Sequence, residues 1–248
     1  MTAQIHPLAG RTNDGFIARF AMKDFPKSQP QTREWIDDFI IPRGKATILG
    51  LDHGQGKTTA ILNSIVSAAA TGVWTLFGTK DHGRPLRCVL ITGEESEEDF
   101  IQKLAFDGKS GALEMARAAI SSGHLIILCL DKIIETTASA ERVFGDDGGL
   151  TETGRGIMSE LSRMNPDVII FDTMRSCGSG DYNSELVASQ TLGSLNLVAR
   201  LCNAAVIMTA HVTKEGATKL KLEEKMQPSA IIGTLRGSGQ IVSQARHV

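Results

Sequence analysis

The sequence has little net charge, a single tyrosine and no long hydrophobic run. Its 248 residues carry a formal net charge of -2, so charge neither indicates a nucleic-acid-binding surface nor excludes a local one. No apolar run approaches the ~20 residues that a membrane-spanning helix needs, and the N-terminus lacks the pattern of a secretory signal. We therefore expect a cytoplasmic protein.

Cysteine is also scarce, and the cysteines are widely spaced without any CxxC pair or metal-ligand spacing. We expect reduced, structural thiols at Cys88, Cys129, Cys177 and Cys202. With 42% hydrophobic and 22% charged residues, the composition is that of a globular protein with one large folded domain.

The chain divides into two parts by composition. Residues 1–33 mix Gly, Asn, Pro, Gln and Ser with isolated hydrophobic residues, which predicts an N-terminal arm or tail that a protein partner could order. Residues 34–248 alternate short apolar runs with helical patterns, which predicts an α/β fold with a mostly parallel central sheet flanked by helices.

The expected strands are short runs rich in Val and Ile, and the expected helices have apolar residues at helical spacing. Strands are predicted at 46–49, 88–92, 125–130, 168–171 and 205–209, and helices at 57–71, 97–106, 154–164 and 186–202. Two stretches rich in Gly, Asp, Lys and Thr, 135–153 and 213–227, predict surface loops.

A glycine-rich turn lies between the first strand and the first helix and ends in Gly56-Lys57-Thr58. This context is typical of a Walker A loop, in which backbone N–H groups converge on phosphate oxygens. Lys57 is expected to contact the β- and γ-phosphates of ATP, and the Thr58 hydroxyl to ligate Mg²⁺. The simpler alternative is a Gly-Lys-Thr sequence in an ordinary strand-to-helix turn. The candidate nucleotide-binding residues are Asp52, His53, Gly54, Gln55, Gly56, Lys57, Thr58 and Thr59.

Two adjacent carboxylates, Glu94 and Glu95, follow the second strand. Ligands of open α/β sheets bind at the carboxyl ends of strands, where a carboxylate could deprotonate the water that attacks the γ-phosphate. Glu94 is the candidate catalytic base. The acids from Glu95 to Asp99 are equally suited to the cap and first turn of a helix.

The apolar run 168–171 ends in Asp172, which has the form of a Walker B strand. Asp172 is expected to hold a magnesium-bound water opposite Thr58. The last expected strand brings His211 to the same edge, where it could contact the γ-phosphate or the catalytic carboxylate, or only cap the strand. Arg236 lies in a glycine-rich turn and is either a mobile catalytic cation or a residue of a solvated loop.

Together these residues resemble the RepA-like branch of the RecA-type P-loop ATPases, which includes hexameric replicative helicases of plasmids and phages. The resemblance extends over most of the chain, through segments 33–45, 76–78, 89–96, 172–175, 210–214 and 236–238. It implies a RecA-like ATPase domain over 34–248 that hydrolyses ATP with Mg²⁺ in a homo-oligomeric, hexameric ring around single-stranded DNA. It further implies that Glu94 is the catalytic glutamate, His211 the polar sensor and Arg236 the arginine supplied by a neighbouring subunit.

The sequence departs from the family at three places. The first glycine of the P-loop pattern is Leu51 here, although Gly50 stands one position earlier. The usual pair of histidines is Ala210-His211, and the acidic cluster after Walker B is reduced to Asp181-Tyr182-Asn183.

Three functions are therefore compared. The first is a homo-oligomeric ATPase acting on single-stranded DNA as a helicase or replication protein. The second is a regulatory or scaffold ATPase that switches a protein partner without moving on DNA. A P-loop kinase for a small molecule is the third, but no lid or acceptor-site pattern is present. Candidate DNA-contacting residues of a channel loop are Lys214, Lys219, Lys221 and Lys225.

Overall fold

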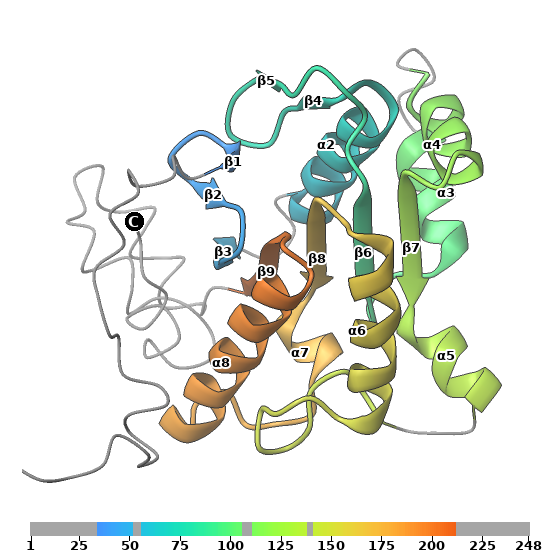
Figure 1. Cartoon of the computed structure of the whole chain (residues 1–248). Helices are drawn as coiled ribbons and strands as arrows, with labels where there is room; N and C mark the ends of the chain where they lie inside the picture. The colour runs from blue at the N-terminus through green and yellow to red at the C-terminus, as the bar shows by residue number, and fades with distance from the viewer. Residues whose placement is uncertain (1–33, 52–55, 106–110, 138–140, 212–248) are drawn as a thin grey trace, which may run out of the picture. The chain divides into compact units, whose positions relative to one another are not determined.

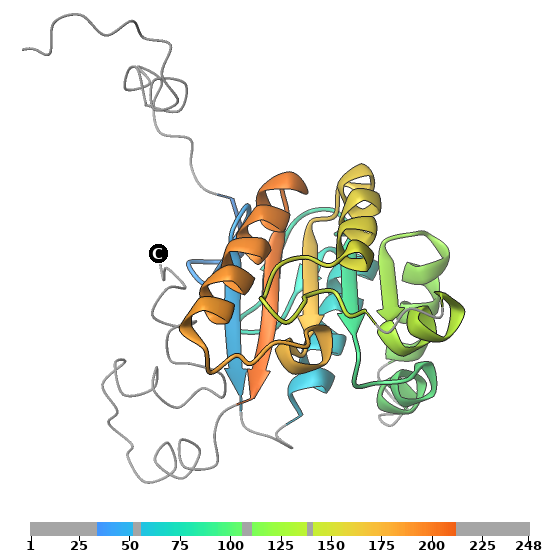
Figure 2. The same cartoon turned by 90° about the horizontal axis from the view of Figure 1, so that it is seen from below.

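In the computed structural model of the chain, residues 34–51, 56–105, 111–137 and 141–211 are described. They form a parallel five-stranded sheet covered by helices on both faces (Figures 1 and 2). In sheet order the strands are β3 (Ala46–Leu51), β9 (Ala205–His211), β8 (Val168–Asp172), β6 (Cys88–Thr92) and β7 (Leu125–Cys129). The expected α/β architecture with a parallel sheet is confirmed.

The central strands are apolar on both faces because both faces are covered. Every residue of β6 and of β8 is buried, which explains why these segments read as continuous apolar runs without alternation. One face packs against α2 (Lys57–Thr71), α3 (Glu97–Ala105) and α4 (Ala112–Ser121). The other packs against α5 (Leu130–Thr137), α6 (Glu152–Met164), α7 (Met174–Cys177) and α8 (Glu185–Leu201).

Four short strands lie outside the main sheet and form two antiparallel pairs. They are β1 (Trp35–Asp37) with β2 (Ile41–Pro42), and β4 (Val73–Trp74) with β5 (Lys80–Asp81). Asp37 joins the pairs, because its Oδ2 accepts hydrogen bonds from Trp74 Nε1 at 3.0 Å and from the Phe77 amide at 3.2 Å.

The two ends of α2 are both glycines with positive φ. Gly56 precedes the helix at φ 73°, and Gly72 follows it at φ 85°. A Cβ at Gly56 would meet nothing within 4 Å, whereas a Cβ at Gly72 would lie 2.3 Å from the carbonyl oxygen of Arg84. Gly72 is therefore required both by its backbone conformation and by the close approach of the segment before β6.

Several expected boundaries were correct and others were wrong. The helix at 57–71 and the strand at 88–92 have the expected bounds, but Leu130 begins α5 rather than ending a strand. The loop expected over 135–153 is wrong in part. Its first residues belong to α5, its last belong to α6, and within it Val143 and Phe144 are fully buried in the core. The loop expected at 213–227 lies outside the described residues.

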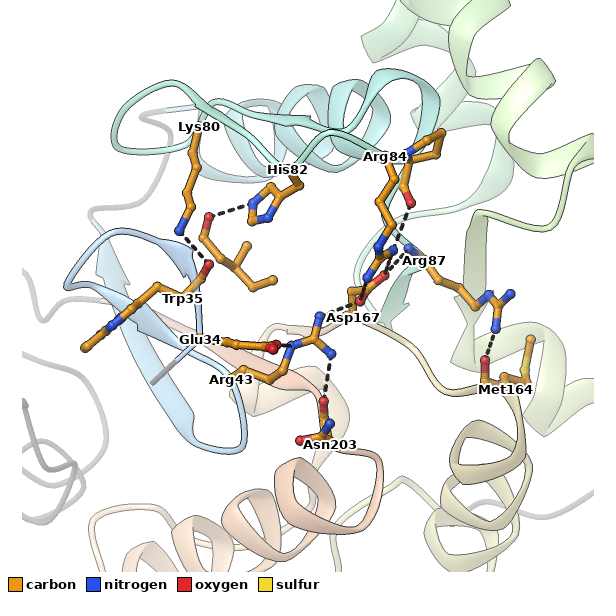
Figure 3. A network of polar contacts seen from close by, with 12 residues as sticks. Glu34, Trp35, Arg43, Lys80, His82, Arg84, Arg87, Met164, Asp167 and Asn203 are labelled. Carbon is orange, nitrogen blue, oxygen red and sulfur yellow. Dashed lines mark hydrogen bonds and ion pairs between the residues drawn. The ribbon is translucent and has the colours of Figure 1, made fainter. Parts of the chain in front are cut away.

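The amino edge of the sheet is joined by a network centred on Asp167, just before β8 (Figure 3). Its buried carboxylate accepts hydrogen bonds from both Nη atoms of Arg84 at 2.9 and 2.7 Å, from the Arg87 amide at 2.8 Å, and from Arg43. Arg43 also donates to the Asn203 carbonyl at 2.9 Å. Burial alone would raise the pKa of this carboxyl group, but the bonds from Arg84, Arg43 and the Arg87 amide hold the pKa of Asp167 well below its usual value.

All four cysteines lie in the described residues and none forms a disulfide, as expected. None of the helices in the described part of the chain is both long enough and apolar enough to span a bilayer.

Candidate functional site

The expected site residues meet at the carboxyl edge of the sheet, around the start of α2. Lys57 is the first residue of this helix and is only 6% exposed. Its Nζ lies 3.3 Å from Nδ1 of His211, the last residue of β9. Burial lowers the pKa of Lys57, and the charges of Asp172 and Glu94 partly oppose this shift. A buried cation is thus held at the position where a Walker A lysine would meet phosphate oxygens.

Asp172 ends β8 and is almost fully buried. Its two carboxylate oxygens each accept a hydroxyl hydrogen bond: Thr58 Oγ1 lies 2.9 Å from Oδ2, and Thr209 Oγ1 lies 2.5 Å from Oδ1. The proximity of Thr58 and Asp172, expected from the sequence, is therefore present although the residues are 114 positions apart. Hydroxyl and carboxylate oxygens are the hard ligands that Mg²⁺ prefers, so this pair fits a magnesium site.

Glu94 lies beside these residues and is held by a second threonine. Its Oε1 accepts a hydrogen bond from Thr173 Oγ1 at 2.5 Å and lies 3.5 Å from His211 Nε2. Its side chain is 36% exposed, so the carboxylate is open to water while it is oriented by the protein. Lys57, His211 and Glu94 thus lie in one line of polar contacts, with one ring nitrogen of His211 near each neighbour.

The neighbouring Glu95 has a different environment. It forms an ion pair with Lys103 of α3 and does not share the contacts of Glu94. Ser96 and Asp99 cap α3 reciprocally: the Ser96 amide donates to Asp99 Oδ2 at 2.9 Å, and the Asp99 amide donates to Ser96 Oγ at 3.2 Å. The cap interpretation therefore accounts for Asp99, and Glu94 alone of the two adjacent glutamates lies in the site.

Gly93 fixes the position of Glu94. A Cβ at this residue would lie 2.9 Å from the carbonyl oxygen of Ser176 in α7, so the segment after β6 packs closely against that helix. The Glu94 amide donates to Thr92 Oγ1 at 3.2 Å, which adds a second constraint. The backbone before the candidate base is thus held by β6 and α7.

Two threonines of the site, Thr173 and Thr209, were not predicted as site residues from the sequence. Both are fully buried, and each donates a hydrogen bond to a carboxylate of the site. Thr173 follows Asp172 directly, so its place beside Walker B was a usable signal. Thr209 is a lone hydroxyl in the apolar strand β9, and only the sheet order reveals its partner.

A cavity of about 300 Å³ adjoins the site. It is lined in part by Thr173 and His211 on one side and by Arg175, Asp181 and Asn183 on another. The segment with the reduced acidic cluster therefore lines the same cavity as Thr173 and His211.

Other expected site residues are only partly covered by the structure. Gly56 and Thr59 lie in the described residues, at the start of α2, and Leu51 pairs with His211 in the β3–β9 ladder. Asp52, His53, Gly54, Gln55 and Arg236 lie outside the described residues, as do the lysines of the expected channel loop.

Comparisons with known proteins bear on the family and the fold of the chain. A family model described as an AAA domain matches residues 18–217. No curated protein matches the chain. Among solved structures, a DnaB-like replicative helicase, described with its interactions with primase, matches with a TM-score of 0.50 and 17% identity over 82% of this chain. The chain spans 46% of that helicase chain.

A second similar structure is a KaiC-like protein from the hyperthermophilic archaeon Pyrococcus horikoshii. It matches with a TM-score of 0.45 and 18% identity over 73% of each chain. The likeness to the helicase confirms the RecA-like P-loop fold that the sequence predicted.

Proposed function

The chain belongs to the AAA domain family, and on this premise we propose that it hydrolyses ATP at the carboxyl edge of its sheet. The observation that carries the proposal is the meeting of Thr58 with Asp172 at 2.9 Å, beside a buried Lys57 and an oriented Glu94. These groups come from two strand ends and one helix start, and they converge at one edge of the sheet.

Each residue has a chemical role in the proposal. The P-loop and the ammonium of Lys57 would bind the phosphates, and Thr58 and Asp172 would hold Mg²⁺. The metal, when bound, neutralises charge that develops on the phosphates. Glu94 takes the proton of the attacking water, and His211 lies between it and Lys57, where it responds to the γ-phosphate.

His211 requires a particular proton arrangement to connect its neighbours. A neutral imidazole carries a single ring proton, and with the Lys57 ammonium donating to Nδ1 that proton belongs on Nε2, the nitrogen 3.5 Å from Glu94 Oε1. When a phosphate attracts Lys57 away, Nδ1 loses its donor. The contact between His211 and Glu94 is therefore sensitive to nucleotide.

We further propose that the protein works as a homo-oligomeric, ring-shaped motor on single-stranded DNA, as a hexameric helicase or replication protein. The resemblance to RepA-like ATPases and the fold shared with a DnaB-like replicative helicase support this. Arg236 is the candidate arginine supplied by a neighbour. The alternative is a regulatory ATPase that switches a protein partner, bound in part through residues 1–33.

The test is ATP turnover of the full chain with and without single-stranded DNA, with Lys57→Ala as the inactive control. Turnover that Lys57→Ala abolishes and that single-stranded DNA stimulates several-fold supports both steps of the proposal. Turnover indifferent to DNA favours the regulatory alternative. Equal turnover in wild type and Lys57→Ala contradicts the ATPase assignment.

Assembly is tested by mixing Arg236→Ala subunits with Lys57→Ala subunits. If Arg236 acts across a subunit boundary, some interfaces of the mixed assemblies combine an intact P-loop from one subunit with an intact arginine from the other. ATPase activity should then partly return. No return in mixtures that co-assemble contradicts the trans arrangement.

A further inference from the structure

Thr209 is the one polar side chain within β9 before its final histidine, and it is fully buried. Residues Ala205 and Ile207 of the same strand pack on the side of the sheet covered by α2. Because side chains alternate along a strand, Thr209 and His211 face the same side, toward the helix that begins with Lys57. Thr209 thus places a hydroxyl next to Ala205 and Ile207 on the side of β9 that is otherwise buried and apolar.

The Thr209 hydroxyl has a specific partner. Its Oγ1 donates to Asp172 Oδ1 at 2.5 Å, from the strand adjacent to the aspartate. Thr58 donates to the other oxygen from the helix side at 2.9 Å. A carboxylate rotates broadly about its last torsion unless both oxygens are bound, so these two donors together fix its plane.

The two donors differ in how firmly they are held. Thr58 lies in the first turn of α2, directly after the loop that would meet the nucleotide, and is partly exposed. Thr209 lies within a buried ladder between β3 and β8 and is fully buried. The fixed reference for Asp172 is therefore Thr209.

We propose that Thr209 is a positioning residue of the metal–nucleotide site. Its hydroxyl holds the Asp172 carboxylate in the orientation that receives a magnesium-bound water, and it acts through Asp172 without touching nucleotide. This inference rests on the proposed ATPase function. Partners that orient a metal-binding group typically change metal affinity 10- to 100-fold when removed.

A structural role predicts something different. If Thr209 only fills space, Val is its isostere, and Thr209→Val leaves the metal site unchanged. If the hydroxyl positions Asp172, Thr209→Val weakens metal binding, and Thr209→Ser, which keeps the hydroxyl, restores most of it. The matched control is Thr191→Val. Thr191 is another buried threonine, whose hydroxyl donates to the Val187 carbonyl within α8.

The experiment measures Mn²⁺ binding to the full-length protein in the presence of ADP by electron paramagnetic resonance, together with ADP affinity in EDTA. Thr209→Val is expected to weaken Mn²⁺ binding by about 10- to 100-fold and to change metal-free ADP affinity by less than about twofold. Thr209→Ser and Thr191→Val are expected to stay close to wild type. Thr209→Ala replaces Thr209→Val if the latter does not fold.

The outcomes separate the two proposals. Mn²⁺ affinity of Thr209→Val equal to wild type overturns the positioning role and leaves the ATPase proposal intact. An equal loss in Thr209→Ser also overturns it, because the hydroxyl is then irrelevant. A wild-type protein whose ADP binding is indifferent to Mn²⁺ overturns the proposed metal–nucleotide site itself, and the positioning role with it.

Discussion

Strand β8 begins just after one buried aspartate and ends on another, and the two have opposite surroundings. At the amino end, Asp167 receives hydrogen bonds from Arg84, Arg43 and an amide. At the carboxyl end, Asp172 receives hydrogen bonds from two neutral threonine hydroxyls, those of Thr58 and Thr209. Each carboxylate is satisfied in hydrogen bonds, but only the first is matched by cations bonded to it.

This difference separates a structural carboxylate from a binding one. Guanidinium groups neutralise Asp167 and join the segment after β2, the segment before β6 and the start of β8. Hydroxyls orient Asp172 without a bonded cation, and the ammonium of Lys57 lies nearby, which suits the metal and phosphate binding that we propose for this end of the strand. The two carboxylates therefore differ in the number and in the charge of their donors.

The largest expected effect is at the carboxyl end, in Glu94→Gln. The amide cannot accept the proton of the attacking water, so the turnover rate should fall by about 10² to 10⁴-fold while ATP still binds. Steady-state ATPase assays and equilibrium nucleotide binding check this. Glu95→Gln is the matched control, since Glu95 pairs with Lys103, and it should stay near wild type. Loss of turnover in Glu95→Gln, with Glu94→Gln active, would show that Glu94 is the wrong choice of catalytic base.

The second prediction compares an asparagine substitution of Asp167, just before β8, with one of Asp172, at its end. Asp167→Asn leaves guanidinium groups without their anion and should lower the free energy of unfolding by about 3 kcal/mol. Asp172→Asn should change it by less than about 1 kcal/mol but abolish metal-dependent nucleotide binding. Urea unfolding and Mn²⁺ titration check both. The contrast between the ends of β8 fails if both variants show the same phenotype.

The third prediction concerns Gly72, whose backbone packs against the carbonyl of Arg84. An alanine at position 72 would have to adopt a positive φ, and its Cβ would press on the Arg84 carbonyl. Gly72→Ala should therefore lower the free energy of unfolding by about 2 kcal/mol. Gly111→Ala is the control, because Gly111 has φ 63° with nothing within 4 Å, and it should cost only about 1 kcal/mol. Equal losses would show that backbone strain alone acts at Gly72.

The smallest expected effect is a pH dependence. The folded pKa of Asp167 lies below its unfolded value of about 4, so the unfolded state binds more protons in acid. The stabilisation from this shift is fully present above about pH 5 and is lost as the pH falls toward the folded pKa. Over that range the free energy of unfolding falls by at most about 1.4 kcal/mol per pH unit. The stability difference between wild type and Asp167→Asn should therefore shrink between pH 5 and pH 3. A stability difference that stays constant over this range would contradict the prediction.

The sequence predicted the elements best where one periodicity dominates. The bounds of β6 and α2 were correct because an uninterrupted apolar run and a long helical pattern leave no alternative. Strand ends were placed too early at Phe171 and Thr209, since the polar residues that follow, Asp172 and His211, still belong to the strands. The helix α7 has four residues and too little pattern to be detected.

The candidate site was predictable to a different degree. Lys57, Thr58, Glu94, Asp172 and His211 were all placed at the sheet edge by their motifs, and the structure brings them together. Thr209 was not, because the sequence does not state that β9 neighbours β8. The roles of these residues, and those of residues 52–55 and of Arg236, remain predictions.

The position of β9 has a consequence for how the protein is made. Among the described strands β3 pairs with β9 alone, and Ala46 finds its partner Val206 only 160 positions later. A ribosome that adds roughly 5–20 residues per second therefore exposes β3, unpaired, for on the order of 10 s. Such distant pairing slows folding and leaves an apolar edge open to aggregation. The strand that leads into the P-loop is therefore synthesised long before the strand that completes its pairing in the sheet.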